Sequence, residues 1–233
     1  TVKDNGYGKI NKITVVSSDD MVNWTDHGEI LAAGPQGAAK WANNSWAPAA
    51  AHKTINGKEK FFLYFADNGS GIGVLTADSP IGPFTDPLGT QLVSRSTPGA
   101  SDVTWLFDPA VLVDDDGSGY LYFGGGIPSG KDADPGTARV VKLGADMISL
   151  DLTASNGTTK PINPPWLFED SGIHKYNGKY YYSYCTNFSS GHPADIPTGA
   201  IGYMVSDNPM GPFTFVKTIL PNPATFFGVG GNN

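Results

Sequence analysis

Short apolar and aromatic runs separated by turn residues extend along the whole chain. Three aromatic runs begin 59 and 60 residues apart: 61-FFLYFAD-67, 120-YLYFGGG-126 and 180-YYYSYCTN-187. Each run follows a turn that contains a glycine, at Gly57, Gly119 or Gly178. Runs rich in aromatic residues and bounded by turn residues predict β-strands. Three copies at one interval predict a repeated unit of about sixty residues.

Two further features recur at nearly the same interval. A short strand followed by Asp and a turn occurs four times: 15-VVSSDDMVNW-24, 74-VLTADSPIGPF-84, 140-VVKLGADMISL-150 and 203-YMVSDNPMGPF-213. Upstream of each aromatic run, the segments 45-SWAPA-49, 107-FDPAV-111 and 168-FEDSG-172 place Trp46, Asp108 and Glu169 62 and 61 residues apart.

Repeats of this length with several short strands predict the blades of a β-propeller, in which sheets pack face to face around a central channel. Equivalent positions of successive blades then surround one axis, so we expect Trp46, Asp108 and Glu169 to converge near the channel mouth. Residues 1–32 resemble the later strands of one blade, three blades follow, and 224-ATFFGVGGNN-233 resembles the first strand of another. The end pieces either close a four-bladed ring or belong to a larger propeller.

Composition supports one all-β domain over residues 1–233. The 30 glycines and 18 prolines interrupt any long helical pattern, and aromatic residues make up 12% of the chain. A formal net charge of -7 without a compensating basic cluster argues against a nucleic-acid partner. The sequence contains neither an apolar run long enough to cross a membrane nor a signal-peptide core, so we expect no membrane partner.

Glu169 and Asp108 are the candidate catalytic residues, because glycoside hydrolysis requires a pair of carboxyl groups. Glu169 follows Trp166, Leu167 and Phe168, and an apolar setting favours the protonated form that a general acid needs. A salt bridge at a strand end is the structural alternative for Glu169. Asp108 lies inside an apolar run, where binding of main-chain amides is its structural alternative.

Aromatic residues close to these acids are the candidate sugar-binding residues. Trp46 and Trp105 offer flat apolar faces on which a sugar ring can stack, although a tryptophan in the core is the alternative for each. Phe107 directly precedes Asp108 and joins this group.

No metal site is expected among these residues. The run 114-DDDG-117 lacks the spacing and the closing Glu of a calcium loop, and a hairpin turn at Asp116 and Gly117 explains it better. The four histidines show no ligand spacing. The single Cys185 lies in an aromatic run and is expected to be buried.

The segments 45-SWAPA-49, 73-GVLTADSPIGPFTD-86, 107-FDPAVLVDDDGSGYLYFGG-125 and 168-FEDSGIHKYNGKYYYSY-184 resemble signature segments of glycoside hydrolase family 43. The resemblance implies a five-bladed β-propeller and an inverting hydrolase of arabinose- or xylose-containing polysaccharide. It implies Glu169 as general acid, Asp108 as the residue that raises the pKa of the acid and orients it, and Trp46 as part of the sugar pocket.

The chain departs from the family pattern at both ends. The family's general-base Asp lies in an Asp-Pro context near the start of the first blade, and this sequence has no matching residue. We therefore expect incomplete first and last blades, and no hydrolysis by this chain alone.

The resemblance favours an α-L-arabinofuranosidase, with a β-xylosidase next, that is secreted and uses no cofactor. A structural calcium ion in the channel stays open. The alternative from another class is a non-catalytic carbohydrate-binding or scaffolding propeller.

Overall fold

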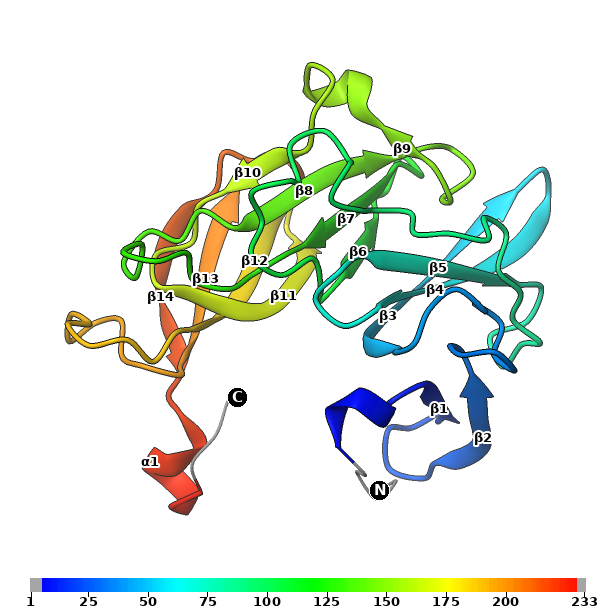
Figure 1. The fold of residues 1–233 in the computed structure, drawn as a ribbon, viewed down its shortest axis with the longest axis horizontal. Coiled ribbons are helices and arrows are strands. Elements are labelled where there is room, and N and C mark those ends of the chain that lie inside the picture. Colours follow the sequence, from blue (N-terminus) through cyan, green and yellow to red (C-terminus); the bar gives the residue numbers. More distant parts are fainter. Residues whose placement is uncertain (1–5, 230–233) are drawn as a thin grey trace.

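The computed structural model describes residues 6–229, which form an all-β structure with few helices. Four separate sheets succeed one another along the chain, and each pairs its strands antiparallel. In Figure 1 the sheets follow an arc from β1 and β2 in blue to β14 in red. The all-β prediction is confirmed, while the count of five blades stays a prediction.

The first two sheets contain two and three strands. The strands are β1 (Lys12–Ser17) and β2 (Thr25–Leu31), then β3 (Trp46–Ile55), β4 (Lys58–Ala66) and β5 (Ile72–Ala77). A short 3₁₀ helix, η1 (Tyr7–Lys9), precedes β1.

The third and fourth sheets are larger. The third contains β6 (Ala110–Val113), β7 (Gly119–Phe123), β8 (Ala138–Leu143) and β10 (Lys160–Ile162), with β9 (Leu150–Asp151) also paired to β8. The 3₁₀ helix η2 (Leu152–Ser155) follows β9. The fourth contains β11 (Leu167–Tyr176), β12 (Lys179–Thr186), β13 (Ile201–Ser206) and β14 (Thr214–Leu220).

The three aromatic runs became the second strand of their sheets, β4, β7 and β12, as the repeat predicts. Their turns differ in detail. Asn56 and Gly57 both have positive φ, as do Asn177 and Gly178, which is the requirement of a tight two-residue hairpin. Gly119 instead begins β7, and Gly117 at φ 79° is the turn glycine of that hairpin. The turn predicted at 114-DDDG-117 is therefore confirmed.

The C-terminal prediction was wrong where the structure describes it. Residues expected to start a further strand form the short helix α1 (Pro223–Phe227), because Asn222 caps the amide of Ala224 and Pro223 suits the first helical turn. Residues 230–233 of the same segment lie outside the described part of the chain.

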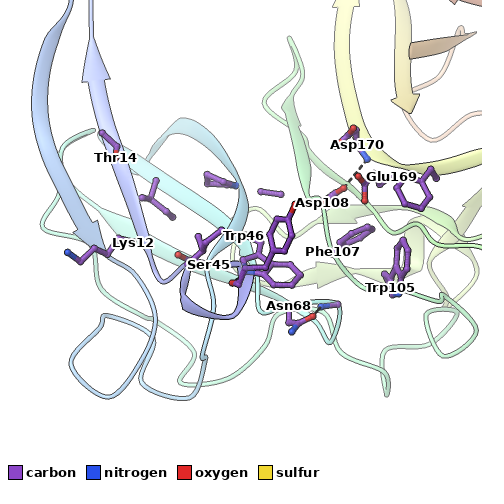
Figure 2. Close-up of a pocket in the computed structure, with 17 residues that line it drawn as sticks. Lys12, Thr14, Ser45, Trp46, Asn68, Trp105, Phe107, Asp108, Glu169 and Asp170 are labelled. Carbon is purple, nitrogen blue, oxygen red and sulfur yellow. Dashed lines mark hydrogen bonds between the residues drawn. The ribbon is translucent and has the colours of Figure 1, made fainter. Parts of the chain in front are cut away.

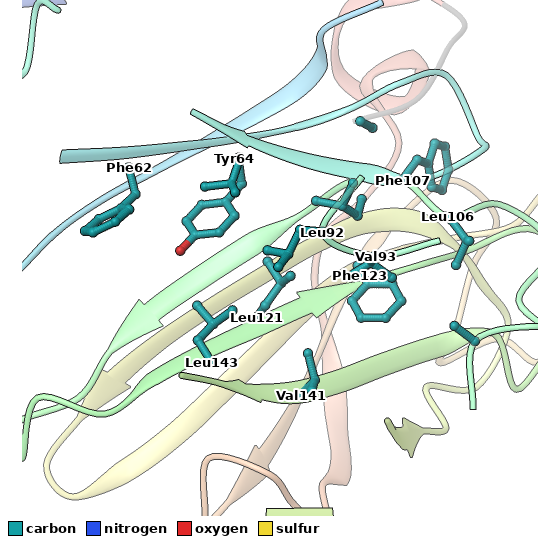
Figure 3. Packing of buried hydrophobic residues seen from close by; sticks show 14 of the residues in the cluster. Phe62, Tyr64, Leu92, Val93, Leu106, Phe107, Leu121, Phe123, Val141 and Leu143 are labelled. Atoms are coloured by element: carbon teal, nitrogen blue, oxygen red, sulfur yellow. The ribbon is translucent and has the colours of Figure 1, made fainter. Parts of the chain in front are cut away.

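Three hydrophobic clusters fill the spaces between consecutive sheets, because strands such as β4 and β7 bury both faces. Leu63 and Phe65 of β4 pack toward the first sheet, whereas Phe62 and Tyr64 pack toward the third. Figure 3 shows this second contact, where Phe62 and Tyr64 lie opposite Leu121 of β7 and Leu143 of β8. Face-to-face packing of successive sheets is the arrangement that the repeat predicts.

The first strands of the second, third and fourth sheets lie closest to one another. β3 contacts β6, and β11 contacts both β6 and β7. This arrangement brings together residues that are about sixty positions apart in the sequence.

Candidate active site

A pocket of about 790 Å³ lies where β3, β6 and β11 begin. All five predicted site residues line it: Trp46, Trp105, Phe107, Asp108 and Glu169. Figure 2 shows Asp108 and Glu169 next to each other, with Phe107 and Trp105 beside them. The convergence expected from the repeat is therefore present in the structure.

Asp108 precedes β6 and is buried, with 9% of its surface exposed. Its Oδ2 accepts a hydrogen bond from the main-chain N–H of Asp170, with an N···O distance of 2.9 Å. Burial raises the pKa of Asp108, and this hydrogen bond opposes the rise only in part. Binding of a main-chain amide, the structural alternative for Asp108, thus occurs in the same pocket as its proposed catalytic partner.

Glu169 lies in β11 and is partly buried. It pairs with Cys185 of β12, and the register of the two strands shifts on both sides of this pair, between Leu167 and Glu169 and between Glu169 and Gly172. Such bulges redirect side chains next to functional sites. Cys185 itself is buried, as predicted.

Aromatic side chains form two walls of the pocket. The Trp46 indole Nε1 donates to the carbonyl oxygen of Tyr7 at 2.9 Å, and the two rings meet edge to face. Trp105 meets Phe107 and Phe168 edge to face, at centroid distances of 5.3 and 5.5 Å. Apolar faces next to carboxyl groups suit a ligand with both C–H and O–H groups, such as a sugar.

Sequence reasoning missed Asp170. This carboxyl lines the pocket, and burial together with the charge of Asp108 raises its pKa to about 6. Its position beside Glu169 gave no signal, because adjacent residues of a regular strand point to opposite faces. Ser45, Asn68 and Lys12 also line the pocket and were likewise not predicted.

Strained backbone is concentrated here. Four lining residues other than glycine have positive φ: Ala47 (43°), Asn68 (56°), Asp108 (49°) and Asp170 (68°). Conformations of this kind are costly outside glycine and cluster at functional sites.

Between residues 6 and 229, no group of three or more His, Cys, Asp or Glu side chains is arranged to hold a metal ion. Over the same residues, no helix has the length and apolar character required to span a bilayer.

Comparison with known proteins gives concordant results. The model of glycosyl hydrolases family 43 matches residues 4–172. The arabinoxylan arabinofuranohydrolase of Paenibacillus polymyxa is 65% identical over 243 residues, which cover 100% of this chain and 38% of the relative.

Two solved structures are similar to the chain. A family 43 arabinoxylan arabinofuranohydrolase from Bacillus subtilis, in complex with cellotetraose, has a TM-score of 0.93 at 61% identity and covers 99% of this chain and 49% of its own. An α-L-arabinofuranosidase from Clostridium thermocellum has a TM-score of 0.76 at 44% identity, with coverage of 94% and 65%. The chain thus spans about half or less of the length of its most similar relatives.

Proposed function

Because this chain belongs to glycosyl hydrolases family 43, we propose that it is part of an inverting hydrolase that releases α-L-arabinofuranosyl units from arabinoxylan. The observation that carries the proposal is one pocket that gathers Asp108, Glu169 and Trp46 from three sheets. The preference for arabinofuranose over xylose rests on the named activity of the relatives with the highest identity. Those names describe hydrolases and do not favour the non-catalytic alternative.

In this proposal Glu169 is the general acid, which protonates the glycosidic oxygen as the bond to the sugar breaks. Asp108 orients Glu169 and disfavours the loss of its proton by placing a second carboxyl in the same buried site. The N–H of Asp170 holds Asp108 in the required position.

Trp46, Trp105 and Phe107 bind the apolar face of the sugar in this proposal. The chemistry needs carboxyl groups and water, and no cofactor. We also propose that the enzyme acts outside the cell, because a plant cell-wall polysaccharide is its substrate.

The test compares turnover of 4-nitrophenyl α-L-arabinofuranoside, 4-nitrophenyl β-D-xylopyranoside and arabinoxylan by the full-length natural protein. We expect arabinose release with inversion, observed by NMR of the first-formed anomer. Glu169→Gln should lower kcat on arabinoxylan by about 10²–10⁴-fold, the usual contribution of general acid catalysis. The exposed Glu59, which bonds Thr54 and His52, provides the control Glu59→Gln. Full activity of Glu169→Gln would refute the assignment of the acid.

A further inference from the structure

The bulge in β11 places two consecutive carboxyl groups in one pocket. Side chains of a regular strand alternate between its faces, yet Glu169 and Asp170 both line the pocket. The register shift between Glu169 and Gly172 and the left-handed backbone of Asp170, at φ 68°, account for this departure. The local structure therefore accepts strain in order to place Asp170 beside Glu169.

Asp170 contacts the acid pair in two ways. Its N–H donates to Oδ2 of Asp108 at 2.9 Å. Its own Oδ2 is buried and has no hydrogen-bond partner in the described part of the chain, so protein donors leave the charge at this oxygen uncompensated. An uncompensated carboxylate acts at short range on the neighbouring acids.

The other ionisable groups around Asp170 do not neutralise it. Asp108 faces it from the segment before β6, and Tyr182 faces it from β12, where the Tyr182 hydroxyl bonds Ser171. Across the pocket, Lys12 of β1 is the cationic lining residue, and its Nζ bonds Glu29 at 2.6 Å.

We propose that Asp170 is a positioning residue for the general acid: its N–H fixes Asp108, and its carboxylate adds a second negative charge that keeps Glu169 protonated. This inference rests on the proposed function, in which Glu169 is the acid. It adds a third member to the acidic set, in the only bulged position of β11 that carries a carboxyl group besides Glu169 among the described residues.

The sign of the effect follows from the ionisation of Asp170. Its pKa of about 6 means that its charge appears as the pH rises toward neutral. The charge therefore develops in the range where Glu169 must resist losing its proton, and it extends activity to higher pH. Removing the charge should move the alkaline limb of the activity profile to lower pH.

The test uses Asp170→Asn in the full-length natural protein. Asparagine keeps the N–H, the shape and the tolerance for positive φ, and removes only the charge. We expect the alkaline limb of kcat/KM to move down by about 0.5–1 pH unit, an effect typical of one nearby charge. Asp170→Gly, which adopts φ 68° without strain, is the second variant and should give the same direction.

Leaving-group dependence gives an independent readout. Arabinofuranosides with poor leaving groups need the general acid, so at pH 7.5 their kcat/KM should fall about tenfold in Asp170→Asn, and less with a dinitrophenyl leaving group. Asp195→Asn removes an exposed charge outside the pocket and is the matched control.

The outcomes separate this inference from the proposed function. A uniform loss at every pH and for every leaving group, or an unchanged profile, would overturn the role of Asp170 while wild-type turnover supports the function. Absence of wild-type turnover on every arabinofuranoside would refute the function and this inference together.

Discussion

Replacing Asp170 by Asn should stabilise the folded protein at neutral pH. Folding raises the pKa of Asp170 from 3.8 to about 6, because burial and the charge of Asp108 disfavour its ionised form. A folded-state pKa above the unfolded value means that the wild type loses stability as the pH rises from about 4 through 6. Asparagine does not ionise, so the variant avoids this loss.

The magnitude follows from the size of the shift. A rise from 3.8 to about 6 corresponds to a ceiling of about 3 kcal/mol at about 1.4 kcal/mol per pH unit. Asp170 is only partly buried, and solvent screening lowers the expected gain to about 1–2 kcal/mol above pH 7. Below pH 4 the carboxyl is protonated in both states, so the gain should disappear.

Urea titrations at pH 4.0 and 7.5, followed by tryptophan fluorescence, measure this difference between variant and wild type. Asp195→Asn, which removes an exposed charge, should show no comparable gain at either pH. An equal free-energy difference at both pH values, or a less stable Asp170→Asn protein at pH 7.5, would refute the electrostatic reasoning.

Three further substitutions test the fold and the pocket. Gly124→Ala should cost about 2–4 kcal/mol in urea unfolding, since the new Cβ would lie 2.3 Å from a main-chain oxygen at φ 101°; a cost below about 0.5 kcal/mol contradicts this. Lys175→Met should cost about 2–3 kcal/mol at pH 7, because the mostly buried Asp114 loses its cation; unchanged stability would show that Tyr180 alone satisfies that carboxylate. Trp105→Ala should raise KM for arabinoxylan oligosaccharides about tenfold with a smaller change in kcat, and an unaltered KM would remove it from the sugar site.

The repeat was sufficient to locate the pocket. Trp46, Asp108 and Glu169 occupy equivalent positions in successive repeats, and equivalent positions of packed sheets lie close together. Their chemical types could be read from the sequence because an acid within an apolar run needs a structural or catalytic reason.

The ends of the repeats were harder to predict than their centres. The segment after β14 contains aromatic residues that suit a strand, yet an asparagine cap and a proline give its described part a helical turn. Such local capping competes with periodicity where no neighbouring strand enforces extension.

By itself, the sequence determined the all-β class, the order of strands and the identity of the two acids, because the spacing of aromatic runs and the apolar context of Asp108 and Glu169 are local properties. Only the tertiary structure decided that Asp170 joins them. Its place depends on a bulge between β11 and β12, and a shift in strand register reverses which face a side chain occupies. Register is fixed by packing between sheets, which a single strand's sequence does not encode.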